Sequence, residues 1–143
     1  MQLPEERVLE FIKEHHVLTF ATAIENQPWC ANCFYSFFKD EMMLVFTSDE
    51  KTKHIQDALS NKMIAGSIVL ETSIVGKIQG IQFTGILSEP EPEIESKIQR
   101  NYLKRFPFAV LTNTKLWTIK LNHIKMTDNR LGFGKKLYWN RED

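Results

Sequence analysis

Three apolar segments follow one another in the first third of the chain, with only short polar turns between them. They cover residues 17–24, 29–38 and 42–46 and are rich in β-branched and aromatic residues, which favours strands. The turns, Glu25-Asn26-Gln27-Pro28 and Lys39-Asp40-Glu41, leave no room for a helix. Strands joined so closely pair antiparallel, so the sequence predicts an antiparallel sheet rather than alternating βαβ units.

The rest of the chain adds further strands and a few helices. Apolar spacing predicts strands at residues 63–70, 77–87 and 117–121, the last extending to 126 at most, and helices at residues 8–12, 51–59 and 94–106. Gly80 and Gly85 mark bulges or close approaches, and the tail from Asp128 to Trp139 is expected to be irregular. We therefore expect one domain, residues 1–143, that is mainly β with flanking helices: a six-stranded antiparallel barrel of the α+β class.

Charge and hydropathy narrow the possible partners. The net charge is zero, which argues against nucleic-acid binding, but residues 1–96 carry a net −8 and residues 97–143 a net +8. The basic part could line the site of an anionic ligand, or it could meet the acidic part in the fold or across a dimer. Because no apolar run approaches the ~20 residues of a membrane span and the N-terminus is acidic, we expect a cytoplasmic protein without membrane segments.

The segment from Met42 to Gln56 carries the clearest functional signal. The apolar run 42–46 ends in two hydroxyls, Thr47 and Ser48, and Lys51-Thr52-Lys53 follows at the start of an expected helix. Ammonium groups, hydroxyls and free backbone N–H groups at a helix start suit a dianionic phosphate. The same residues would also suit an ordinary solvated helix start, with Ser48 or Asp49 as its N-cap.

Other candidate motifs are weaker. Cys30 and Cys33 form a Cys-x-x-Cys, but in a strand positions i and i+3 point to opposite faces, so we expect two buried, reduced cysteines; thiol-disulfide chemistry is a distant alternative. The histidines have no metal-ligand or triad spacing, so no metal site and no catalytic residue are assigned. The aromatic and amide residues that could hold a flat heterocycle, or simply fill a core, are Trp29, Gln79, Gln82, Trp117 and Trp139.

The order and spacing of several segments resemble the pyridoxamine 5′-phosphate oxidase-like family of flavin-binding split-barrel proteins. The matching segments are Leu18-Thr19-Phe20-Ala21-Thr22-Ala23, Gln27-Pro28, Leu44-Val45-Phe46-Thr47-Ser48, Lys51-Thr52-Lys53 and Ile64-Ala65-Gly66-Ser67-Ile68. The chain is most similar to the YhbP-like branch, through Trp29-Cys30-Ala31-Asn32, Asp49-Glu50-Lys51-Thr52-Lys53-His54, Tyr102-Leu103-Lys104-Arg105-Phe106-Pro107 and the segment Thr127–Lys136.

The resemblance implies an FMN-binding split barrel that forms a homodimer with two FMN sites at the subunit interface. The residues that it places around FMN are Lys51, Thr52 and Lys53 at the phosphate, Thr47 and Ser48 at the polar edge of the ring, Trp29, Cys30, Ala31 and Asn32 beside the ribityl chain and ring, and Gln82 and Trp117 from the partner subunit. One departure stands out: pyridoxamine phosphate oxidases carry an Arg early in the second strand, where this chain has Cys30, Ala31 and Asn32.

The sequence thus favours a flavin-dependent oxidoreductase of unnamed substrate, and the missing Arg argues against oxidation of vitamin B6 itself. The family that this chain resembles also includes haem-binding and F420-binding members. The alternative is therefore a non-enzymatic binding module for FMN, haem or another flat anionic ligand.

Overall fold

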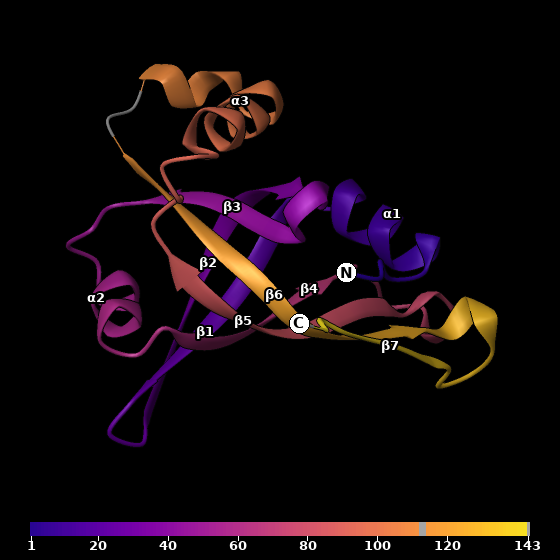
Figure 1. Cartoon of the computed structure of the whole chain (residues 1–143). Helices are drawn as coiled ribbons and strands as arrows, with labels where there is room; N and C mark the ends of the chain where they lie inside the picture. Colours follow the sequence, from indigo (N-terminus) through magenta and orange to yellow (C-terminus); the bar gives the residue numbers. More distant parts are fainter. Residues whose placement is uncertain (112–113, 143) are drawn as a thin grey trace.

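The computed structural model describes residues 1–111 and 114–142, which form one antiparallel sheet of seven strands with helices around it (Figure 1). The strands are β1 (Val17–Ile24), β2 (Gln27–Phe38), β3 (Met43–Ser48), β4 (Met63–Val69), β5 (Gln79–Ser88), β6 (Lys115–Asp128) and β7 (Lys136–Asn140). Their order across the sheet is β3-β2-β1-β4-β5-β6-β7, and β3 also pairs with β6. That pairing closes β1 to β6 into a ring, which confirms the six-stranded antiparallel barrel.

The barrel opens along β6, which has different neighbours in its two halves. Residues 115–120 pair with β3, whereas residues 123–127 pair with β7. Between the halves, the register with β5 shifts at Thr84/Gly85. A Cβ on Gly85 would lie only 2.7 Å from the carbonyl oxygen of Lys120, so glycine permits the close approach that the sequence predicts here.

The expectation of an irregular tail is wrong for its last part. Residues 129–135 form a turn, in which Gly132 and Gly134 have φ of 138° and 74°. Lys136–Asn140 then returns as β7 beside β6. A short strand of this kind is stabilised by its partner, and its own five residues carry too little pattern to predict it.

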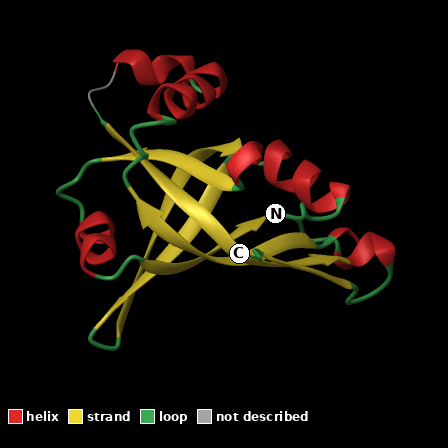
Figure 2. Ribbon diagram, viewed as in Figure 1, coloured by secondary structure: helices red, strands yellow, loops and turns green. Residues whose placement is uncertain are grey.

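Within the described residues, three α-helices lie outside the barrel (Figure 2). They are α1 (Glu6–Glu14), α2 (Lys53–Ser60) and α3 (Glu95–Arg105), and short 3-10 helices lie at Lys39–Glu41, Val75–Lys77, Pro107–Leu111 and Asn129–Leu131. The residues of α2 that face the barrel are Ile55, Asp57 and Ala58. The N-cap of α2 is Thr52, so the expected start at Lys51 with Ser48 or Asp49 as N-cap is wrong by a few residues.

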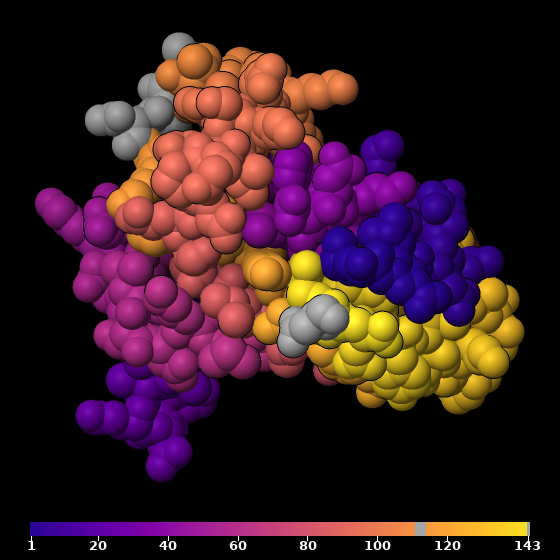
Figure 3. Space-filling view, viewed as in Figure 1, coloured from indigo at the N-terminus to yellow at the C-terminus, as the bar shows by residue number. Residues whose placement is uncertain are grey.

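Strand alternation gives the sheet two distinct faces. In β1, Leu18, Phe20 and Thr22 point into the barrel, where they are buried. The intervening residues of β1 and their neighbours on β2, β4, β5 and β6 point away from the barrel core; we call this surface the outer face. The β1–β2 hairpin extends beyond the body of the barrel, and it projects on its own in the space-filling view (Figure 3).

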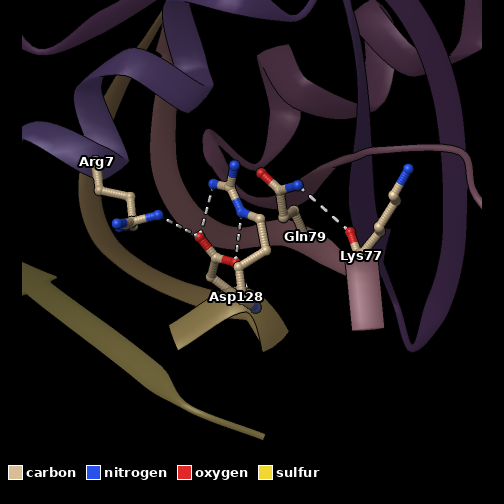
Figure 4. Close-up of polar contacts among 5 residues, drawn as sticks. Arg7, Lys77, Gln79 and Asp128 are labelled. Carbon is tan, nitrogen blue, oxygen red and sulfur yellow. Dashed lines mark hydrogen bonds and ion pairs between the residues drawn. The ribbon is translucent and has the colours of Figure 1, made fainter. Parts of the chain in front are cut away.

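A buried carboxylate fastens α1 to the end of β6 (Figure 4). Asp128 has no exposed surface, and its Oδ2 accepts hydrogen bonds from Arg7 Nη1 at 3.1 Å and Arg130 Nη2 at 2.9 Å. Its Oδ1 accepts from Arg130 Nε at 3.0 Å. The Arg130 hydrogen bond lowers the pKa of Asp128, burial opposes this shift and Arg7 adds to it, so the carboxyl is ionised at neutral pH.

Within residues 1–111 and 114–142, no helix is long and apolar enough to cross a membrane.

Candidate functional site

The loop between β3 and α2 is held in a defined shape by one aspartate. Asp49 Oδ1 accepts a hydrogen bond from the backbone N–H of Lys51 at 2.8 Å. The carbonyl oxygen of Asp49 accepts from Thr52 Oγ1 at 2.8 Å and from the Thr52 N–H at 3.1 Å. The first N–H groups of α2, from Lys53 onward, have no carbonyl of the helix to bind. The loop therefore presents the free backbone N–H groups of a helix start, whereas the Thr52 hydroxyl is bound within the loop.

The two lysines of this loop differ in their surroundings. Lys51 is exposed, and none of the described carboxylates forms an ion pair with it. Lys53 Nζ donates to both carboxylate oxygens of Asp57, at 3.2 and 3.1 Å, and lies 5.5 Å from the centre of the Trp29 ring. Lys51 is therefore the cation of the loop that is free to meet an anion.

Asp57 is the reason why Lys53 is less available to an anion than Lys51. Its carboxylate accepts a hydrogen bond from Thr22 Oγ1 at 2.9 Å in addition to those from Lys53. Burial acts to raise the pKa of Asp57, but the hydrogen bonds from Lys53 and Thr22 outweigh it and the pKa is lowered. A charged Asp57 thus neutralises much of the charge of Lys53 and ties α2 to β1.

On the barrel side of the loop, His54 is enclosed by the end of β3. Its Nε2 lies 2.6 Å from Ser48 Oγ and 3.2 Å from Thr52 Oγ1, and its ring meets Phe20 edge-on at 5.5 Å. Burial lowers the pKa of His54, and the Asp57 charge opposes this, so the imidazole is neutral at pH 7. The sequence-based prediction did not include His54; the only available signal was its place directly after Lys51-Thr52-Lys53.

A second group of the predicted residues lies on the outer face. The strand register aligns Asn32 of β2, Thr19 of β1, Ser67 of β4 and Gln82 of β5 in one row. Three strand spacings separate the ends of this row, so Asn32 and Gln82 are about 14 Å apart within one chain. Thr19 Oγ1 donates to Asn32 Oδ1 at 2.6 Å. The row brings Asn32 and Gln82 to the same surface without bringing them into contact.

The neighbouring row consists mainly of small side chains. It runs from Cys30 through Ala21 and Ala65 to Thr84. Together the two rows form a shallow surface with little side-chain bulk at its centre. A flat ligand or a second protein surface could approach the sheet backbone closely there.

Three predicted residues are placed away from both groups. Ala31 points to the barrel interior and packs against the core. Trp117 is fully buried, and its Nε1 donates to the carbonyl oxygen of Ser48 at 3.0 Å, so in a single chain it has no surface to offer a partner subunit. Thr47 faces α3, with Oγ1 3.3 Å from the Tyr102 hydroxyl, and lines a cavity of about 220 Å³. Thr47 and Ser48 therefore point to different sides of β3 instead of to one ring edge.

The two cysteines are on opposite faces of β2, as the sequence predicts. Cys33 is half-buried, and burial raises its pKa to about 11. Cys30 is exposed on the outer face, which corrects the expectation that both are buried. Both thiols are free, and their divergence does not support a redox Cys-x-x-Cys.

The helices α1 and α3 border a hollow that lies away from the β3–α2 loop. A cavity of about 470 Å³ between α1, α3 and the end of β2 contains none of the predicted residues; Leu9, Phe37 and Asn101 line it. Among residues 1–111 and 114–142, no three His, Cys, Asp or Glu side chains are grouped as metal ligands. The exposed residues among those predicted, which are Trp29, Cys30, Asn32, Lys51, Lys53 and Gln82, thus lie on open surface of one chain.

Comparison with known proteins supports the fold. No protein-family model matches the sequence. A UPF0306 protein of Photorhabdus laumondii is 40% identical over 131 residues, covering 92% of each chain, and one of Yersinia pseudotuberculosis is 36% identical over 143 residues, covering 99% of this chain and 97% of the relative.

Among solved structures, a haem-binding protein from Mycobacterium smegmatis matches with a TM-score of 0.75 and 15% identity, covering 92% of this chain and 56% of that one. A FAD-binding protein from Mesorhizobium loti matches with a TM-score of 0.69 and 14% identity, covering 87% and 94%. At these identities the likeness concerns the fold alone, and it confirms a mainly β, antiparallel split barrel with flanking helices.

Proposed function

The chain belongs to the UPF0306 family, and we propose that it binds FMN at two equivalent sites between the subunits of a homodimer. The observation that carries the proposal is the β3–α2 loop. Its backbone is fixed by Asp49, its Lys51 ammonium has no ion pair with any described carboxylate, and it opens onto the start of a helix. We place the phosphate of FMN there.

Lys51 is the charge of the loop that suits a phosphate monoester. Of the nearby carboxylates, Asp57 binds Lys53 and Asp49 accepts the Lys51 N–H. Glu50 lies 3.9 Å from Lys115, which also pairs with Glu89. Lys51 and the first N–H groups of α2 would then bind the phosphate, with Thr52 at the N-cap and Lys53 adding a partly neutralised charge. Charge-assisted hydrogen bonds of this kind are the strong ones in proteins.

The ring of FMN would lie along the first half of β2, against a second subunit. Trp29 is 47% exposed and Cys30 and Asn32 are exposed, so this part of β2 has no cover in the single chain. Gln82 is exposed on the same outer face and would be supplied by the partner. Two large outer-face side chains, Phe34 and Val69, are 61% and 67% exposed, and a dimer would cover them.

When bound, FMN would supply two-electron hydride chemistry, and the protein would bind, orient and shield it. We propose a flavin-dependent oxidoreductase on this basis, and we assign no residue as general acid or base. Oxidation of vitamin B6 is not proposed, because Cys30, Ala31 and Asn32 stand where its oxidases carry an Arg. Placement in the YhbP-like branch is part of the same proposal.

The alternative is a non-enzymatic binding module for FMN, haem or another flat anionic ligand. The Mycobacterium smegmatis protein of the same fold is a haem-binding protein, so a split barrel of this kind can serve another flat ligand. An open apolar and amide-bearing surface would accept either flat group.

The absorbance spectrum of freshly purified protein, before and after incubation with FMN and gel filtration, separates these functions. We expect the bands of an oxidised flavin, with one FMN per chain. A Soret band would favour the haem-binding alternative. A colourless protein that takes up no FMN would contradict the proposal.

A further inference from the structure

His54 is the side chain that connects the parts of the β3–α2 loop. It is the second residue of α2, yet its Nε2 lies 2.6 Å from the hydroxyl of Ser48, the last residue of β3. The same nitrogen lies 3.2 Å from Thr52 Oγ1 at the N-cap. Because the ring also packs edge-on against Phe20 in the core, one imidazole links the strand end, the helix start and the barrel interior.

We propose that His54 is a positioning residue for the phosphate of FMN: its Nε2 holds the hydroxyls of Ser48 and Thr52, and this contact fixes the loop in the shape that presents Lys51. The inference rests on the proposed function. His54 would not bind the phosphate itself. It would act through the loop, which otherwise could turn Lys51 and the N–H groups of α2 away from the ligand.

The anchor behind this contact is buried. Ser48 is buried, and its carbonyl oxygen accepts the indole N–H of the fully buried Trp117. Trp117 thus supports the site from within its own subunit. The Thr52 hydroxyl also donates to the Asp49 carbonyl, so the imidazole contacts a residue that already belongs to the loop's hydrogen-bond network.

The charges around His54 predict a pH signature. Lys53 and Asp57 lie on its own helix. The loop adds Asp49, Glu50 and Lys51, and Lys115 of β6 lies near Glu50. The side chains that β1 presents, Phe20 and Thr22, are uncharged. Burial lowers the pKa of His54, and a dianionic phosphate at the helix start would raise it. FMN binding would then take up a proton, so the affinity for FMN should rise as the pH falls.

A matched pair of variants tests the role. His54→Phe keeps a ring against Phe20 but loses the contact with Ser48, whereas His54→Gln keeps a hydrogen-bonding group near the position of Nε2. We expect His54→Phe to raise the Kd for FMN about tenfold or more while the Kd for riboflavin, which lacks the phosphate, changes less than about twofold. His54→Gln should bind FMN within about threefold of the wild type, and Ser48→Ala should repeat the effect of His54→Phe.

The pH profile gives an independent readout. Between about pH 8 and about pH 6.5, where the FMN phosphate keeps most of its second charge, the wild type should gain a few-fold in FMN affinity. His54→Gln should not show this gain.

Several results would overturn the inference. If the wild type binds FMN and His54→Phe binds it equally well, His54 has no positioning role, although the proposed function stands. Equal losses for FMN and riboflavin, with a lowered melting temperature, would mean that His54 only stabilises the fold. If the wild type binds no FMN, both the proposed function and this inference fail.

Discussion

The ion pair between Asp128 and Arg7 adds to the apolar packing that holds α1 on the barrel. Asp128→Asn removes a buried charge that binds two guanidinium groups, and it should lower the free energy of unfolding by about 1–3 kcal/mol, since Arg7 and Arg130 are half-exposed. Urea denaturation at pH 7 measures this difference. Asp40→Asn, an exposed acid without an ion pair to any described residue, is the control and should change stability by less than about 0.5 kcal/mol.

The pH dependence of this difference has a definite sign. The pKa of Asp128 is lowered in the folded protein, so its contribution is complete above the unfolded value of about 3.9 and is lost as the pH falls through the lower folded value. The deficit of Asp128→Asn should therefore stay constant from about pH 8 to about pH 5 and shrink only below about pH 4. A deficit that already disappears near neutral pH would contradict the described ion pairs.

For single residues, the sequence predicted which side chains could hold a phosphate, but it did not predict which of them form ion pairs within the chain. Lys51 and Lys53 are equivalent in the sequence, and only the fold shows that Asp57 binds one of them. His54 was missed because its partner Ser48 is six positions away, on another element. Which side chains meet across a strand end and a helix start depends on how the barrel closes, and local patterns carry no information on that.

The close contact between β5 and β6 at Gly85 predicts how a larger side chain there would change the stability of the fold. A Cβ there would lie 2.7 Å from Lys120 O and 2.8 Å from Ile119 Cγ2, so Gly85→Ala should destabilise the fold by about 1–3 kcal/mol through overpacking. Thermal unfolding followed by circular dichroism measures the loss. Gly76→Ala is the matched control, because a Cβ at Gly76 meets nothing within 4 Å. Equal effects of the two variants would rule out the close approach of the strands.

At the scale of elements, prediction succeeded where the pattern is local. The strand over Val17–Ile24 was predicted with its observed ends, because β-branched and aromatic residues are bounded there by the Glu25-Asn26 turn. The helix expected from Lys51 instead begins at Lys53, since Asp49 binds the Lys51 N–H and forms a turn first. A side chain that hydrogen-bonds a backbone N–H competes with the helix for that group. The difference in free energy between the two arrangements is small, and residue spacing does not predict it.

For the whole molecule, we predict a homodimer whose interface includes the outer face. Ala65 lies near the centre of that face, beside Ala21 and Thr84, and is exposed. Ala65→Arg should therefore produce a monomer in sedimentation velocity at micromolar concentration, and it should weaken FMN binding. Glu93→Arg, an exposed change ahead of α3, should leave the dimer intact. A wild-type monomer that still binds FMN would remove the interfacial site and the role of Gln82.

The most direct test of whether the β3–α2 loop is a phosphate site is a titration with FMN and, in parallel, with riboflavin. It compares the wild type with Lys51→Ala and Lys104→Ala. Lys51→Ala should weaken FMN binding by about 1.5–3 kcal/mol, roughly 10- to 150-fold, because a charge-assisted contact to the phosphate is lost. Its affinity for riboflavin should be unchanged, and Lys104→Ala, on the exposed surface of α3, should affect neither ligand. Loss of affinity for both ligands alike in Lys51→Ala, or tight FMN binding that Lys51→Ala leaves intact, would contradict the account.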